Sequence, residues 1–259
     1  MAHPDDEILW FSSIIAQVSR VIVCYMGQAG RPKIAAGREA ALHAHPVPSI
    51  LSLGIEEANV YGLARWPQAM PAAEGLELAC GHSHPAATRY RANHDSLVDQ
   101  LTKLLAGFDA VFTHNPWGEY GHEEHVQVYR AVKRAQVGSG FALWCSSYTG
   151  SRTHDLMARC LDGMRVEMLT LDTDVVLAQV AAQRYKEQGV WTWFDEYVWP
   201  ARESFLRLTP GGNTPQPLLL NYLNTGLPIL RGADRSLRTL VRNIRQRLPL
   251  PPSAPFDPV

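Results

Sequence analysis

The sequence predicts an α/β fold, with a Rossmann-like, doubly wound and mainly parallel sheet that carries helices on both faces. Short apolar runs typical of buried parallel strands alternate along the chain with longer amphipathic stretches typical of helices. Such alternation indicates strands joined by crossover helices. With 259 residues, of which 46% are hydrophobic and 19% charged, the chain fits one such domain. We expect this domain over residues 1–248 and a proline-rich tail over residues 249–259.

The expected strands are short runs rich in β-branched and other apolar residues, at residues 20–26, 59–61, 109–113, 141–148 and 166–171. The expected helices have amphipathic composition, at residues 34–45, 95–105, 123–135, 174–188 and 234–247. A further helix is expected to start at Asp5 or Asp6 and to reach Val18, because an aspartate can cap it and Glu7 complements its dipole. The basic helix at residues 234–247 has the composition of a solvated outer face, with contact to anionic lipid as the alternative.

Two segments are expected to form the rim of a site. Residues 62–92 contain prolines, glycines and histidines without periodicity, and long loops of this kind are disproportionately functional. Residues 189–200 are dense in aromatic side chains, including Trp191 and Trp193. Flat indole rings stack on sugars or on other aromatic rings, and the alternative is a core patch or a subunit interface.

The chain enters a motif at once, since residues 2–7 read AHPDDE. In a doubly wound fold such a motif belongs to the loop after the first strand. We expect that the numbering begins inside a longer natural chain, and the alternative is a sheet that lacks its first strand.

Charge and composition exclude some partners. The formal net charge of −1 and the pI near 6.8 give no basic excess that would indicate nucleic-acid binding. No apolar run reaches the roughly 18 residues of a membrane span, and no signal peptide is recognisable. Cys24 and Cys145 are expected as buried thiols, whereas Cys80 and Cys160 could pair; reduced cysteines in a cytoplasmic protein are the simpler reading.

Two distant segments together predict a catalytic zinc site. His3, Asp6 and His125 could supply two imidazoles and one carboxylate, which leaves the fourth position that a catalytic zinc keeps for water. Asp5 and His122 would lie beside that water as base and acid. Taken alone, residues 2–7 could equally be a solvated turn with aspartate helix caps. The second segment, GEYGHEEH at residues 118–125, makes that alternative much weaker.

In these two motifs the sequence resembles the PIG-L/LmbE-like family of zinc-dependent N-acetylglucosamine deacetylases. The resemblance extends in weaker motifs to about Leu208. The usual HPDH of the family reads His122-Glu123-Glu124-His125 here, so that both histidines are kept. The family's glycine-rich stretch after the first motif is replaced by residues 9–13, LWFSS.

The resemblance implies amide hydrolysis by a metal-activated water, with Asp5 as general base and His122 protonating the leaving amine. Tyr120 would lie near the developing negative charge. The alternatives are that His122 only caps its helix and that Tyr120 packs its loop. Glu124 is expected to hydrogen-bond a ligand histidine from behind, with a solvated carboxylate as an equal alternative.

Further residues are expected to bind the sugar. Arg38 resembles a family arginine that contacts the substrate near the metal, and a surface arginine is the alternative. His114 and Asn115 end a strand beside the site and are weaker candidates. A separate metal cluster at Cys80, His82 and His84 is not favoured, because no fourth ligand is evident.

The expected function is therefore zinc-dependent removal of the N-acetyl group from an N-acetylglucosamine-type sugar. The rim segments suggest a substrate with a large aglycone, such as a glycopeptide antibiotic intermediate. The alternatives are a glucosaminyl-inositol-type small metabolite, or a metal-holding sugar-binding module without turnover. The sequence does not predict the oligomeric state.

Overall fold

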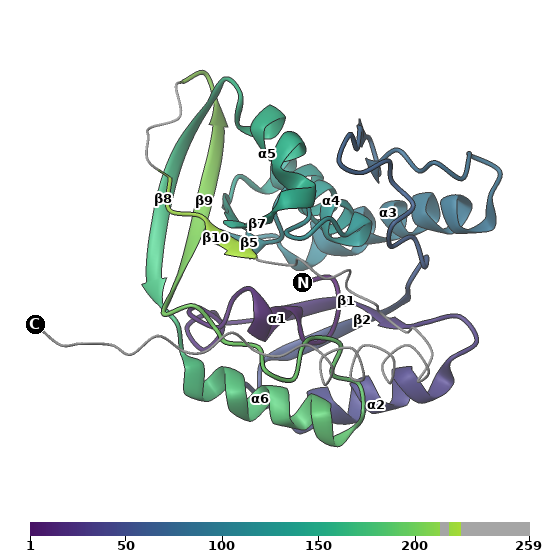
Figure 1. Ribbon diagram of the computed structural model, residues 1–259, viewed down its shortest axis with the longest axis vertical. Helices are drawn as coiled ribbons and strands as arrows, with labels where there is room; N and C mark the ends of the chain where they lie inside the picture. The colour runs from purple at the N-terminus through teal and green to yellow at the C-terminus, as the bar shows by residue number, and fades with distance from the viewer. Residues whose placement is uncertain (213–217, 224–259) are drawn as a thin grey trace, which may run out of the picture. The chain divides into compact units, whose positions relative to one another are not determined.

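The computed structural model describes residues 1–212 and 218–223 (Figure 1). The expected basic helix at residues 234–247, the domain end at residue 248 and the tail at residues 249–259 lie outside this part. The described helices are α1 (Asp6–Leu9), α2 (Pro32–His43), α3 (Pro85–Leu104), α4 (Glu123–Ser139), α5 (His154–Leu161) and α6 (Val175–Glu187), with a 3-10 turn η1 (Ser151–Thr153). The described strands are β1 (Val21–Gly27), β2 (Ile50–Glu56), β3 (Pro71–Ala72), β4 (Gly75–Leu76), β5 (Ala110–Thr113), β6 (Ala142–Ser146), β7 (Tyr148–Gly150), β8 (Met164–Asp172), β9 (Arg202–Pro210) and β10 (Asn221–Leu223).

These elements confirm a mixed α/β fold, but the described strands do not form one doubly wound parallel sheet. β1 and β2 pair in parallel as a two-stranded sheet. A second sheet has the order β5-β6-β9-β8, in which β5 and β6 are parallel whereas β9 runs antiparallel to both of its neighbours. The antiparallel pairing arises because residues 188–201 carry the chain from the end of α6 back to the end of β8, where Asp172 pairs with Arg202.

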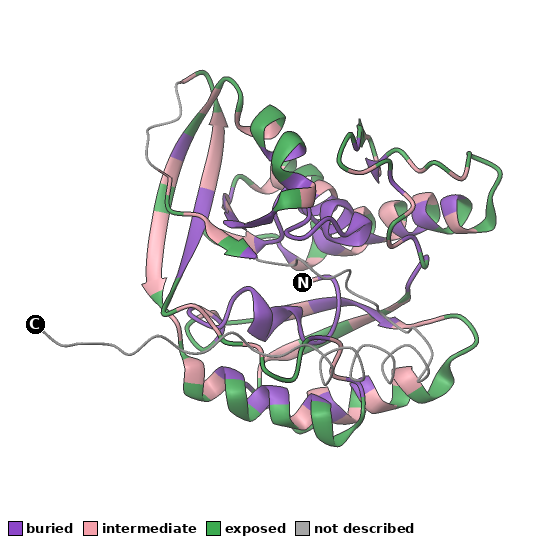
Figure 2. Ribbon diagram, viewed as in Figure 1, coloured by how far each residue is buried: buried purple, intermediate pink, exposed green. Residues whose placement is uncertain are grey.

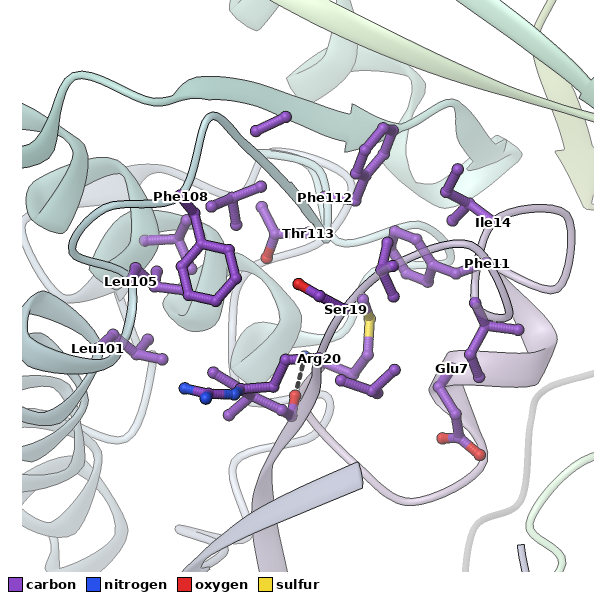
Figure 3. Close-up of a pocket in the computed structure, with 18 of the residues that line it drawn as sticks. Glu7, Phe11, Ile14, Ser19, Arg20, Leu101, Leu105, Phe108, Phe112 and Thr113 are labelled. Carbon is purple, nitrogen blue, oxygen red and sulfur yellow. Dashed lines mark hydrogen bonds between the residues drawn. The ribbon is translucent and has the colours of Figure 1, made fainter. Parts of the chain in front are cut away.

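A largely apolar cavity of about 330 Å³ is lined by residues of β1 and β5, which belong to different sheets. Phe11, Leu101, Phe108 and Phe112 project toward it in Figure 3. Met1 and Ala2 run along β1, and their carbonyls accept hydrogen bonds from the amides of Cys24 and Tyr25. The first residues therefore extend the β1 sheet and lead directly into the turn that carries His3.

Several predicted elements differ from the structure. The first helix ends at Leu9 instead of Val18, because the buried carboxylate of Glu203 accepts hydrogen bonds from the Ser13 amide and the Ser12 hydroxyl and so draws the chain out of the helix. Helix α3 starts at Pro85, inside the segment expected to be a loop. Proline in the first turn suits a helix, and the His84 ring accepts the Ala86 amide as its cap.

Other differences concern strands. No strand forms at residues 59–61, and the pairing partner of β1 is instead β2, with a register irregularity near Gly54, whose φ of 67° requires glycine. The expected strand at residues 141–148 is divided into β6 and β7. The sequence did not predict α5 or the strand β9.

Two large apolar clusters and a smaller one around Val60 and Tyr90 hold the described part together. One large cluster packs α3 and α4 against β5 and β6, through residues that include Leu97, Leu101, Val132 and Leu143. The other large cluster packs α1, α2 and α6 around β1, through residues that include Ile8, Val21, Ala41, Ala178 and Tyr185. Figure 2 shows α1 buried along its length and α6 buried on one side. The polar residues of the two motifs lie at the ends of β1 and β5, where open α/β sheets bind ligands.

Candidate metal centre and active site

The first motif forms a closed turn that directs His3 and Asp6 to one point. The Asp6 amide donates to the His3 carbonyl at 3.2 Å, and the His3 amide donates to Asp6 Oδ2 at 2.7 Å. His3 Nδ1 then lies 3.2 Å from the same Asp6 oxygen. Both residues are fully buried, so the polar atoms of this turn face the protein interior.

The second motif brings His125 to the same oxygen. His125 lies in the first turn of α4, and its Nε2 atom is 3.3 Å from Asp6 Oδ2. This nitrogen is buried and has no hydrogen-bond partner among the described residues, which is the state expected of an atom that ligates a metal. His3 and His125, which come from segments far apart in the sequence, thus each approach the Asp6 carboxylate, at 3.2 and 3.3 Å.

The donor set fits zinc, which prefers imidazole nitrogen and carboxylate oxygen in a tetrahedral arrangement. Among the described residues, three sets of side chains have ligand atoms within 4.8 Å of one another: His3, His122 and His125; Asp6, His114 and His125; and His3, Glu57 and Glu124. The exposed residues His82 and His84 belong to none of them, and Cys24, Cys80, Cys145 and Cys160 are free thiols.

The buried carboxylates and imidazoles around Asp6 and His3 shift the pKa values of these two residues. Burial by itself would raise the pKa of Asp6, but the imidazoles of His125, His114 and His3 hold it well below its usual value. Burial likewise opposes protonation of His3, yet the carboxylates of Glu57, Asp6 and Glu124 raise its pKa to about 9 in the metal-free protein. Asp6 is therefore anionic at neutral pH, as a ligand must be.

Glu124 contacts a predicted ligand from behind. Its side chain is buried, and Oε2 lies 3.1 Å from His3 Nε2 while Oε1 accepts the Ala58 amide at 2.7 Å. A carboxylate only accepts hydrogen bonds, so once a metal displaces the proton on Nδ1, Glu124 keeps the other His3 proton on Nε2 and Nδ1 is left to face Asp6. A solvated position for Glu124, the alternative from the sequence, does not apply.

Glu119, which the sequence did not single out, plays the same part behind His125. His125 Nδ1 donates to Glu119 Oε2 at 2.8 Å, and His114 Nδ1 lies 3.2 Å from that oxygen. Glu119 Oε1 accepts the Asn115 amide at 3.1 Å and the Ser146 hydroxyl. Although burial opposes it, His114 and His125 lower the pKa of Glu119 to about 2. Its one signal in the sequence is an acidic residue within the glycine-rich turn.

Both the backbone amide and the side-chain carboxylate of Asp5 form hydrogen bonds. Its backbone has a φ of 93°, a left-handed conformation that costs a non-glycine residue energy, and its amide donates to Glu7 Oε2 at 2.9 Å. Its carboxylate oxygen Oδ2 accepts the Thr192 amide at 3.0 Å and the Thr192 hydroxyl. Thr192, a second residue that the sequence did not predict, therefore links the aromatic segment 189–200 to the expected base.

His122 and Tyr120 lie against the predicted ligands. The His122 ring stacks on His125 with centroids 4.6 Å apart, and its Nδ1 accepts the Glu124 amide, so His122 does cap α4. With Nδ1 accepting, the ring proton is on Nε2. The buried Tyr120 ring lies 5.3 Å from His125 and 5.1 Å from Trp193.

The predicted sugar-binding residues differ in their surroundings. Arg38 is buried and pairs with Glu57 at 2.6 Å. The side-chain amide of Asn115 donates to the Tyr148 carbonyl at 2.8 Å and thereby organises its own loop, and the His114 Nε2 atom accepts the Ala2 backbone amide at 2.8 Å. Trp193 is buried beside Tyr120. Trp191 is half-buried, with its ring 5.6 Å from Lys186 Nζ of α6.

Both rim segments contact the site. The amides of Gly62 and Ala64 and the indole N–H of Trp66 donate to the buried Glu123 carboxylate, which lies beside His122 in the chain. Segment 189–200 reaches it through Thr192 and Trp193. The later part of segment 62–92 has a different structure: His82 is exposed, and α3 starts at Pro85.

Comparison with known proteins gives relatives named 1D-myo-inositol 2-acetamido-2-deoxy-alpha-D-glucopyranoside deacetylase. The relative from Corynebacterium diphtheriae is 25% identical over 146 residues, which are 49% of this chain and 47% of that protein. The relative from Mycolicibacterium gilvum is 28% identical over 158 residues, 52% of this chain and 51% of that protein. The chain spans about half the length of the curated relatives it matches.

The crystal structure of a deacetylase–teicoplanin complex from the teicoplanin biosynthesis pathway aligns with 81% of this chain and 96% of that chain, with a TM-score of 0.50. At 12% sequence identity, this likeness concerns the fold alone. The model of the PIG-L family, described as GlcNAc-PI de-N-acetylase, matches residues 1–136 of the 259 and includes both motifs. The chain belongs to the PIG-L family.

Proposed function

We propose that the protein is a zinc-dependent N-deacetylase that hydrolyses the acetamide of an N-acetylglucosamine-type sugar. The observation that carries this proposal is the approach of His3 and His125 to the Asp6 carboxylate, at 3.2 and 3.3 Å, in a buried site. Membership of the PIG-L family and the deacetylase names of the relatives support it.

His3 through Nδ1, Asp6 through its carboxylate and His125 through Nε2 would hold the zinc. When bound, zinc lowers the pKa of a water molecule and polarises the acetyl carbonyl. Asp5 would remove the proton from the attacking water, while His122, protonated at both nitrogens and released from the Glu124 amide, would deliver its Nε2 proton to the nitrogen of the breaking C–N bond. Tyr120 borders the position of the carbonyl oxygen. Acetate and the free amino sugar are the products.

Glu119 and Glu124 act through the histidines that they contact. Each accepts the N–H of one imidazole, at 2.8 Å for His125 and 3.1 Å for His3, and so selects the tautomer whose other nitrogen faces the metal. Arg38, His114 and Asn115 lie around these groups. Of the three, the buried Arg38 pair with Glu57 favours positioning of the pocket wall over direct contact with a sugar.

An aromatic cavity of about 320 Å³ beside Trp193 supports a substrate with a large apolar aglycone, such as a glycopeptide antibiotic intermediate. Trp193, Phe194, Tyr197 and Tyr148 line this cavity. Trp193 also contacts Tyr120, so the cavity adjoins the proposed site. The names of the relatives favour a second candidate, a glucosaminyl-inositol-type metabolite.

The proposal includes a single catalytic domain over residues 1–248 with residues 62–92 and 189–200 at its rim. It also places the protein in the cytoplasm, where the four free thiols would stay reduced. None of the described helices is long and apolar enough to cross a membrane.

Metal analysis together with acetate release across a panel of N-acetylglucosaminides tests the proposed function. The proposal expects about one zinc per chain and acetate from at least one glycoside. Stoichiometric zinc with no acetate from any member would instead support the remaining alternative, a sugar-binding module without turnover. Intact Asp5 and His122 argue against that module, since binding alone needs no acid–base pair.

A further inference from the structure

The guanidinium of Arg152 lies between two aromatic rings, close to His122, the proposed acid. Arg152 lies in η1, and its guanidinium carbon is 5.5 Å from the centre of the Tyr61 ring and 5.3 Å from that of Trp66. The indole N–H of Trp66 donates to the buried Glu123 carboxylate at 3.1 Å, so one of the two faces is fixed in place. Arginine held on aromatic faces keeps its N–H donors pre-organised.

The position of Arg152 is next to the reacting groups. A side-chain carbon built on Gly121, the residue before His122, would lie 3.0 Å from Arg152 Cδ and 3.2 Å from Nε. Tyr61, which carries the guanidinium on one side, has its ring 5.0 Å from the His122 ring. The neighbouring Thr153 hydroxyl donates to the Glu119 carbonyl at 3.0 Å and so links η1 to the turn that precedes His122.

The charge of Arg152 is not neutralised by the part of the chain that the structure describes. Within that part it forms no ion pair, and the nearby Glu123 carboxylate is already bonded to the amides of Gly62 and Ala64 and to Trp66. The residue is half-buried, so its N–H groups remain accessible. A pre-organised, accessible guanidinium is the group that proteins use for phosphate and carboxylate.

We propose that Arg152 binds an anionic group of the substrate, a phosphate or a carboxylate, next to the acetamido sugar. The preferred substrates are then N-acetyl amino sugars that carry a negative charge. This inference rests on the proposed deacetylase function and adds the chemical class of the substrate. If Arg152 only packs on Tyr61 and Trp66, the charge of the substrate has no effect.

The turnover experiment compares kcat/KM for methyl N-acetylglucosaminide, N-acetylglucosamine 1-phosphate and N-acetylmuramic acid. The wild type should prefer at least one of the two anionic sugars by about tenfold or more, and which one it prefers separates phosphate from carboxylate recognition. Arg152→Gln should reduce that preference by about 10- to 100-fold, the size of a hydrogen bond to a charged group. Arg152→Lys should keep part of it. Arg134→Gln, which removes an exposed arginine of α4, is the control for net charge and should keep all of it.

Equal turnover of the three sugars by the wild type, or an equal loss on all three in Arg152→Gln, would overturn the inference. If Arg152→Gln does not fold, the ionic-strength dependence of the wild-type preference decides, because recognition by an accessible charge must weaken in salt. A binding readout separates this inference from the proposed function. Even without turnover, N-acetylglucosamine 1-phosphate or N-acetylmuramic acid should raise the melting temperature of the wild type and of Arg134→Gln more than that of Arg152→Gln; equal shifts with both sugars would contradict the role of Arg152.

Discussion

Replacing Glu119 by glutamine should weaken zinc binding although Glu119 is not a proposed ligand. The carboxylate accepts the His125 N–H at 2.8 Å and lies 3.2 Å from His114 Nδ1. Glutamine keeps the size of the side chain but removes the charge, and its amide can present an N–H toward a ring nitrogen that already carries a proton. His125 then loses the partner that holds its Nε2 toward Asp6.

The magnitude follows from the contacts. Loss of the carboxylate behind a ligating histidine costs about 10- to 100-fold in metal affinity, or about 1.4–2.7 kcal/mol. The pKa of Glu119 is lowered from 4.5 to about 2, so the ionised carboxylate stabilises the metal-free fold by on the order of 3 kcal/mol. Because the folded pKa is depressed, this stability is present above about pH 4.5 and is lost as pH falls through about 2. The variant should therefore be less stable than the wild type at pH 7.

The assay is a zinc titration in competition with a chromophoric chelator, together with thermal melts of the metal-free protein. Glu167→Gln is the matched control, since its exposed partner Arg207 lies at 3.4 Å and such surface pairs contribute little. A zinc affinity of Glu119→Gln within twofold of the wild type would refute the role of Glu119. So would an equal loss in the control.

Three further predictions concern catalysis and pH. Asp5→Asn should keep zinc while acetate release falls by about 10²–10⁴-fold, and near-normal release would remove Asp5 from the role of base. Thr192→Val should lower kcat by about tenfold or more with zinc content and KM unchanged, and Thr192→Ser should restore it; a change in KM alone would show that Thr192 does not act through Asp5. Because the folded pKa of His3 is raised to about 9, the stability that its protonation gives the metal-free protein is present below about pH 6.5 and is lost as pH rises through 9. Zinc must displace this proton, so its affinity should increase about tenfold per pH unit between pH 7 and 9, and a flat profile in the chelator titration would contradict this reading.

The parts of the fold that were predictable have local causes. The helix expected at residues 123–135 is observed as α4, Glu123–Ser139, because its apolar periodicity and its first-turn acids are both encoded within the helix. The first helix was wrongly extended because its end depends on Glu203, which is distant in sequence. The strand β9 was missed because polar residues interrupt its apolar pattern, and its antiparallel direction depends on the return of residues 188–201.

In the candidate site, too, the residues that could be predicted lie in local motifs, whereas the missed residues depend on contacts between distant segments. His3, Asp6 and His125 could be proposed from the sequence because each lies in a short motif with characteristic spacing. Glu119 and Thr192 could not, since neither has a characteristic spacing from the residue that it contacts. Glu119 reaches His125 only after its backbone adopts a φ of 54°, and Thr192 reaches Asp5 only when the segment after α6 folds over the first turn.

Anomalous X-ray diffraction at the zinc edge, on crystals of the zinc-loaded protein, tests the central claim most directly. We predict one zinc ion bound by His3, Asp6 and His125, with ligand distances of about 2.0–2.2 Å. A zinc ion bound instead by His114, or held without His3, would contradict the proposed centre.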